Sequence, residues 1–166
     1  GQITFRGNVT IAAGDTATTL INAATVLDGL TFSSAGNVTF GNDAANDQVT
    51  LATSAVGLTV TNGVAVGTPT LTVVSKVDGG QDLTLAVEGL SDFQGAVGNG
   101  TDIGDAIGSA LIINSTGATE FDLTLDTASG ITSANGAGQI TFRGNVTIAA
   151  GNIATSLINA ATVLDG

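Results

Sequence analysis

The chain has 166 residues, of which 43% are hydrophobic and only 10% are charged, and 14 acidic against 3 basic side chains give a net charge of −11. This balance excludes a basic surface for a nucleic-acid backbone and disfavours binding to anionic membranes, and no apolar run is long enough to cross a membrane as a helix. Because Cys and His are absent, disulfides, thiolate metal sites and a Ser–His–Asp triad are excluded as well.

Short triplets of an apolar residue, Thr and a second apolar residue recur along the chain and predict short strands. Each triplet places its apolar side chains on one side and its Thr on the other, which is the period of a half-buried strand. In chain order they are ITF at 3–5, VTI at 9–11, LTF at 30–32, VTF at 38–40, VTL at 49–51, LTV at 58–60 and 71–73, and LTL at 83–85 and 123–125. The segment 18–29, TTLINAATVLDG, is predicted to form strand, turn and strand, because Thr and Val are poor helix formers.

Turn signals separate these strands and predict an all-β fold of stacked coils. Asn-Gly or Asp-Gly pairs occur at Asp28-Gly29, Asn62-Gly63, Asp78-Gly79, Asn99-Gly100 and Asn135-Gly136. The spacings from Asn8 to Asn37 and from Asp82 to Asp122 fit coils of about 20–30 residues with insertions, as in a parallel β-helix. The six Phe residues are expected to point inward and stack on neighbouring coils, with columns of Thr outside. The segment 99–110, NGTDIGDAIGSA, breaks the even spacing and is predicted to protrude as a loop.

The chain carries one phrase twice. Residues 138–166 repeat residues 1–29 almost letter for letter. The copies differ only where Asp15 corresponds to Asn152, Thr16 to Ile153, and Thr19 to Ser156. We therefore expect residues 1–137 to be one full repeat unit and residues 138–166 the start of the next, within a slice of a longer tandem array.

Oxygen-bearing side chains in two loops suggest a site for calcium. The segment GNDAANDQVTL brings together Asn42, Asp43, Asn46 and Asp47, and the segment VDGGQD offers Asp78 and Asp82. Calcium prefers carboxylate and amide oxygens of this kind. The alternative is that these Asn and Asp side chains cap their own turns. No other cofactor is expected.

Two pairs of carboxylates are candidates for catalysis. Glu120 and Asp122 would share one face of a strand about 7 Å apart, and Asp102 and Asp105 would lie in a loop. Paired carboxylates hydrolyse glycosidic bonds in many enzymes. Without Trp or Tyr to stack on a sugar, we expect both pairs to be surface acids and the protein not to be an enzyme.

The segments GGQDLTL at Gly79–Leu85, FQGAVG at Phe93–Gly98 and FRGNVT at Phe142–Thr147 resemble repeats of filamentous-haemagglutinin-like and giant β-strand-repeat bacterial surface proteins. The resemblance implies a right-handed parallel β-helix (β-solenoid), an extracellular or cell-surface location, and a role as fibre, adhesin stalk or coat. The expected partners are other copies of the repeat, joined end to end with lateral association as a further option, together with cell-surface glycans or divalent cations. The alternatives are tandem Ig-like beads rigidified by calcium, and a β-helical polysaccharide-processing enzyme or tailspike.

Overall fold

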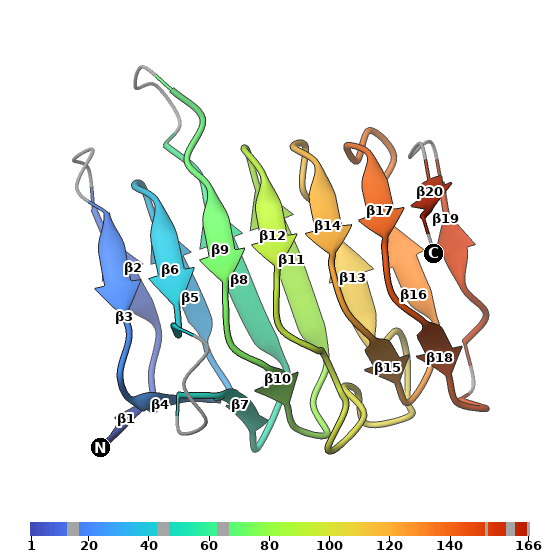
Figure 1. Ribbon diagram of the computed structural model, residues 1–166, viewed down its shortest axis with the longest axis horizontal. Coiled ribbons are helices and arrows are strands. Elements are labelled where there is room, and N and C mark those ends of the chain that lie inside the picture. The colour runs from blue at the N-terminus through green and yellow to red at the C-terminus, as the bar shows by residue number, and fades with distance from the viewer. Residues whose placement is uncertain (13–16, 43–46, 63–66, 152, 159–161, 166) are drawn as a thin grey trace.

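The computed structural model describes residues 1–12, 17–42, 47–62, 67–151, 153–158 and 162–165. They form an all-β solenoid of about six turns in which every strand pair is parallel, as the sequence predicts (Figure 1). Each complete turn passes through three faces in a fixed order. The strands follow one another along the long axis, so the two chain ends lie at opposite ends of the molecule.

The strands are short, and each face collects one strand from every turn. The first face holds β1 (Gln2–Phe5), β4 (Ala24–Asp28), β7 (Val49–Ala52), β10 (Val77–Asp78), the bridging residues Val97 and Ile103, β15 (Leu125–Thr127) and β18 (Val146–Ile148). The second face holds β2 (Val9–Ile11), β5 (Thr31–Ser34), β8 (Val56–Val60), β11 (Leu83–Val87), β13 (Leu111–Ile113), β16 (Ile131–Ser133) and β19 (Ser156–Leu157). The third face holds β3 (Thr18–Leu20), β6 (Val38–Phe40), β9 (Leu71–Val73), β12 (Ser91–Phe93), β14 (Thr119–Phe121), β17 (Ile140–Phe142) and β20 (Thr162–Leu164).

Alternation along each strand builds the core, because every second side chain points into the solenoid. In β12, β14 and β17 the last residue is a buried Phe, and the three rings stack in one column. The ring centroids of Phe93 and Phe121 lie 5.0 Å apart, and those of Phe121 and Phe142 lie 5.5 Å apart. The inward stacking predicted for these Phe residues is thereby confirmed.

The turns differ in length because extra residues are placed at the corners. Leu71 of β9 pairs with Ser91 of β12 on one side and with Val38 of β6 on the other. The chain from Val38 to Leu71 is much longer than the chain from Leu71 to Ser91. Since the strands stay in register across both turns, an insertion at a corner leaves the stack of strands intact.

Glycine marks the corners where one turn packs directly on the next. Gly144 lies just before β18, and a Cβ atom there would come within 2.4 Å of the Leu123 backbone carbonyl. Gly117 and Gly138 lie just before β14 and β17, and a Cβ atom on Gly138 would approach the Gly117 carbonyl oxygen to 2.3 Å. At these corners consecutive turns approach too closely for any side chain.

Two sequence-based placements are wrong in detail. The triplet LTL predicts Leu123 and Leu125 in one strand, yet Leu123 occupies a corner and is 53% exposed, while the strand begins at Leu125. The spacing between Asn8 and Asn37 does not mark a stacked pair, because Asn8 precedes a strand of the second face and Asn37 one of the third. Local triplets fix which side of a strand is apolar, but they do not fix which strand lies above it.

The segment 99–110 agrees with its prediction only in part. It forms a loop with exposed residues, as predicted, and Ile107 is 69% exposed. Ile103 within it is fully buried, however, and pairs with Thr127 of β15 on the first face. Its backbone is held by the previous turn, since the amides of Gly100 and Thr101 donate to the carboxylate of Asp78. The loop is therefore anchored to the solenoid at these points, while most of its residues are exposed.

The segment 18–29 forms strand, turn and strand as predicted, in β3 and β4. No helix in the described part of the chain is long and apolar enough to cross a membrane.

Candidate functional site

The outward column of the third face changes character along the solenoid. Its members in register are Thr19, Thr39, Thr72, Asp92, Glu120, Thr141 and Val163. Thr was predicted on the outside, and the first three positions agree with that prediction. The column then turns acidic at Asp92 and Glu120, which come from adjacent turns and lie directly opposite each other.

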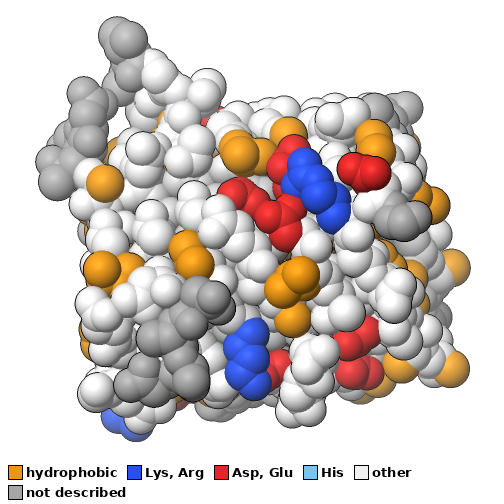
Figure 2. Space-filling model, viewed as in Figure 1, with side chains coloured by type: hydrophobic (Ala, Val, Ile, Leu, Met, Phe, Trp, Pro, Cys, Tyr) orange, Lys and Arg blue, Asp and Glu red, His pale blue; other side chains and the backbone are white. Residues whose placement is uncertain are grey.

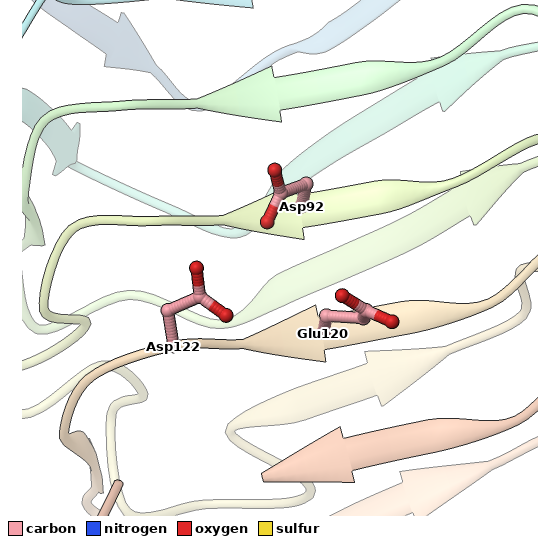
Figure 3. A group of neighbouring side chains, drawn as sticks. All are labelled: Asp92, Glu120 and Asp122. Carbon is pink, nitrogen blue, oxygen red and sulfur yellow. The ribbon is translucent and has the colours of Figure 1, made fainter. Parts of the chain in front are cut away.

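Asp122, just beyond the end of β14, completes a cluster of three carboxylates. An oxygen from each of Asp92, Glu120 and Asp122 lies within 4.8 Å of the others, and all three side chains are half-buried. Figure 3 shows them on two neighbouring ribbons, with Asp92 and Asp122 turned toward each other. Gln94 donates a hydrogen bond of 2.7 Å to Asp92 from the same turn. Like charges this close repel one another unless a cation lies between or beside them.

Arg143 supplies that positive charge from the following turn. Its guanidinium donates a hydrogen bond of 2.8 Å to the carboxylate of Glu120 and another to the carboxylate of Asp122. Figure 2 shows acidic side chains gathered around basic ones on this surface. These hydrogen bonds to Glu120 and Asp122 raise the pKa of Arg143 above its usual value. The site is a surface ion-pair network in which one guanidinium joins two carboxylates.

Arg143 is the repeated copy of Arg6, and the two copies have different surroundings. Arg6 has no turn before it in the structure and lies 3.6 Å from the carboxylate of Asp28 in the following turn. Arg143 instead contacts the preceding turn, which belongs to the unit formed by residues 1–137. The ion-pair network therefore joins the second copy of the phrase to the turn that precedes it.

The residues predicted to bind calcium are distributed over separate corners. Asp43 and Asn46 lie outside the described residues. Asp47 is fully buried. Its carboxylate accepts a hydrogen bond of 2.6 Å from the amide of Asn42 and another from the hydroxyl of Ser75. These contacts hold the corner before β7 against the next turn. Calcium binding here stays a prediction.

Asp78 and Asp82 both contact the segment 99–110. Asp78 is 2.7 Å from the ammonium of Lys76 and accepts from the two amides of the next turn described above. Burial raises the pKa of Asp78, but the hydrogen bonds from Lys76, Gly100 and Thr101 and the Lys76 charge together lower it below its usual value. Burial raises the pKa of Asp82, although the carboxylate accepts from the amide of Asp105 at 3.4 Å.

The second candidate pair for catalysis is part of the same corner. The carboxylate of Asp105 accepts a hydrogen bond of 2.8 Å from the amide of Ile107 and so caps a turn within the segment 99–110. Asp102 is exposed. Glu120 and Asp122 do lie on one surface, as expected from their spacing, and both are bound by Arg143. The first pair is thus an ion-pair network and the second pair includes a turn-capping carboxylate.

Sequence reasoning missed Asp92, Gln94 and Arg143 as members of the cluster. Asp92 belongs to the turn before Glu120, and Arg143 belongs to the turn after it, so Asp92, Glu120 and Arg143 are far apart in the chain. Their only sequence signal was the strand alternation that turns Asp92 and Glu120 outward, and that alternation does not show which turns are neighbours.

Comparison of the chain with protein-family models, with curated proteins and with solved structures finds no match. Function is therefore inferred from the residues of this chain and their arrangement.

Proposed function

We propose that this chain is a repeat of a non-catalytic, rod-forming structural protein, in the manner of the fibres, adhesin stalks and coats of the cell surface. The resemblance to filamentous-haemagglutinin-like and giant β-strand-repeat proteins belongs to this proposal. An Ig-like bead would pair its strands antiparallel, whereas every strand pair described here is parallel. A continuous solenoid therefore accounts for the repeat better than a string of beads.

One observation carries the proposal: the second copy of the repeated phrase continues the solenoid with the same local register as the first. In β1 and β4, Ile3 pairs with Thr25. In β17 and β20, the corresponding pair is Ile140 with Thr162, and these two residues are the repeated copies of Ile3 and Thr25. The repeated sequence thus specifies a pair of stacked turns, and it does so at both of its positions in the stack.

The last turn supports the same conclusion through an exposed apolar side chain. Leu27 in β4 is fully buried, because β7 covers it. Its copy Leu164 in β20 is 80% exposed. A further turn stacked on β20 would bury Leu164 as β7 buries Leu27, and each such turn would add stability.

The proposal predicts the length of longer chains. A β-solenoid rises about 4.8 Å per turn, so one unit of the kind formed by residues 1–137 adds about 27 Å to the rod. Chains with one, two and four consecutive units should appear in electron micrographs as rods that lengthen by this increment, with rising melting temperatures. Separate beads joined by flexible linkers, or lengths that do not scale with unit number, would refute the proposal.

The net charge of −11 suggests how such rods would interact. Rods of like charge repel one another at low salt, and divalent cations reduce this repulsion. We expect light scattering to show lateral association on addition of millimolar Mg²⁺ or Ca²⁺. A specific calcium site would in addition raise the melting temperature with Ca²⁺ but not with Mg²⁺, and an equal response to both ions would mean screening alone.

A further inference from the structure

The two copies of the repeated phrase lie on different faces of the solenoid. QITF at 2–5 forms β1 on the first face, whereas the same letters at 139–142 contain β17 on the third face. VTI at 9–11 forms β2 on the second face, and its copy at 146–148 forms β18 on the first. Every copied strand is displaced in the same sense, by one face.

This displacement follows from the number of faces that one unit crosses. Starting at β1, the chain completes five turns, the fifth of which enters the first face at Val97. It then crosses β15 and β16 and reaches β17, the start of the second copy, on the third face. One unit is therefore five turns and two faces long, and it is one face short of six complete turns.

The segment 99–110 explains why the unit is one face short of six complete turns. The chain between Val97 and its partner Leu125 is longer than the chain between Leu125 and its own partner Val146. The longer turn has enough residues for an additional strand, but part of them form an insertion within the first face, between Val97 and Ile103, which both pair with β15. The rest form the corner that follows, where the amide of Gly104 donates a hydrogen bond to the Gln81 carbonyl. Consequently β13 stacks on β11 and both belong to the second face.

A strand can change face because all three faces make the same demand. Ile140 and Phe142 are buried on the third face, as the partly buried Phe5 packs on the core from the first face. Each face needs only apolar side chains inward, polar ones outward and a small residue at the corner.

We infer that the unit of residues 1–137 is out of phase with the solenoid, so that consecutive units present the same surface on successive faces, turned by a third of a revolution. The extension to consecutive units rests on the proposed function, whereas the phase itself is a property of this chain. In an array, the Asp92–Glu120–Asp122 cluster with its Arg would recur about every 27 Å and return to the same face after three units, about 80 Å. Such a rod offers an identical set of contacts to partners on every side.

Cross-linking of paired Cys residues tests the phase directly, because the chain contains no Cys of its own. In the structure Asp92 lies opposite Glu120, and Ile112 lies opposite Thr84. If the segment 99–110 formed a strand instead, the unit would have six complete turns and Ile112 would lie opposite Asp92. The variants are Asp92→Cys with Glu120→Cys, Asp92→Cys with Ile112→Cys, and Thr84→Cys with Ile112→Cys, each treated with a short bifunctional maleimide.

We expect efficient intramolecular cross-linking in the first and third variants and at least tenfold less in the second. Efficient cross-linking between positions 92 and 112 would overturn the inference. The third variant is the matched control, since it shows that a Cys at position 112 reacts. Circular dichroism of each variant verifies that the fold is retained.

Electron microscopy of the four-unit chain then separates this inference from the proposed function. Rods whose surface pattern returns only after about 80 Å would support both. Rods whose surface pattern repeats with every unit would refute the phase shift but agree with the proposed function. Flexible beads combined with the expected cross-links would refute the proposed function but agree with the phase shift.

Discussion

Replacing Phe121 with Ala tests how much the stacked Phe column contributes to stability. Phe121 is 1% exposed, and its ring lies between two others, with centroids 5.0 and 5.5 Å away and interplanar angles of 19° and 11°. Phe-to-Ala substitutions in cores cost about 3–5 kcal/mol. Each well-placed aromatic neighbour adds about 0.5–1.5 kcal/mol to what burial alone gives. We expect the free energy of unfolding to fall by about 5 kcal/mol, the upper end of the range for Phe-to-Ala, because the substitution removes a ring that packs against two others.

Phe5→Ala is the matched control, since it removes the same side chain from the end of the solenoid. Phe5 is only partly buried and has one ring neighbour, Phe32, at 5.8 Å in an edge-on arrangement. We expect it to cost about 1–2 kcal/mol, the value for partial burial of a large apolar side chain. The two losses are measured by urea unfolding followed by circular dichroism, because the chain has no Trp or Tyr for fluorescence. Equal losses, or a larger one for Phe5, would refute the reasoning.

The remaining predictions concern corners, buried hydroxyls and a carboxylate. Gly144→Ala should lower the melting temperature strongly, because the new Cβ atom would collide with the backbone of Leu123. The same change at its copy Gly7 should leave the melting temperature unchanged, because a Cβ atom there would have nothing within 4 Å. Equal effects of the two changes would contradict the close packing at the corners. The hydroxyls of Ser91 and Thr119 are buried without a hydrogen-bond partner, so the double change Ser91→Ala with Thr119→Val should raise the free energy of unfolding by about 1–3 kcal/mol, and a loss in urea titrations would show that the hydroxyls are satisfied. The lowered pKa of Asp78 stabilises the fold above pH 3.8, its unfolded value, and this contribution is lost as the pH falls through the lower folded value. Asp78→Asn should therefore flatten the dependence of the melting temperature on pH below about 4, and an unchanged dependence would place the titration elsewhere.

The amino-acid sequence by itself determined the strands and their two sides. The apolar–Thr–apolar triplets predicted β6 and β9 with their bounds, and the inward Phe residues followed from the same alternation. Side-chain alternation is a local property of extended backbone, so a single segment is enough to reveal it. The near copy of residues 1–29 also carries its own local register, since Ile3 pairs with Thr25 and Ile140 pairs with Thr162.

Only the tertiary structure decided which strands are neighbours. Leu71 stacks between Val38 and Ser91, which lie at unequal distances from it along the chain, because corners absorb different numbers of residues. The sequence therefore left open that Asp92, Glu120 and Arg143 meet on one surface. It predicted the segment 99–110 as a loop but did not show that Ile103 within it is buried against β15, or that β13 stacks on β11. That last pairing sets the phase of the whole repeat, because every later strand takes its face from the strand before it.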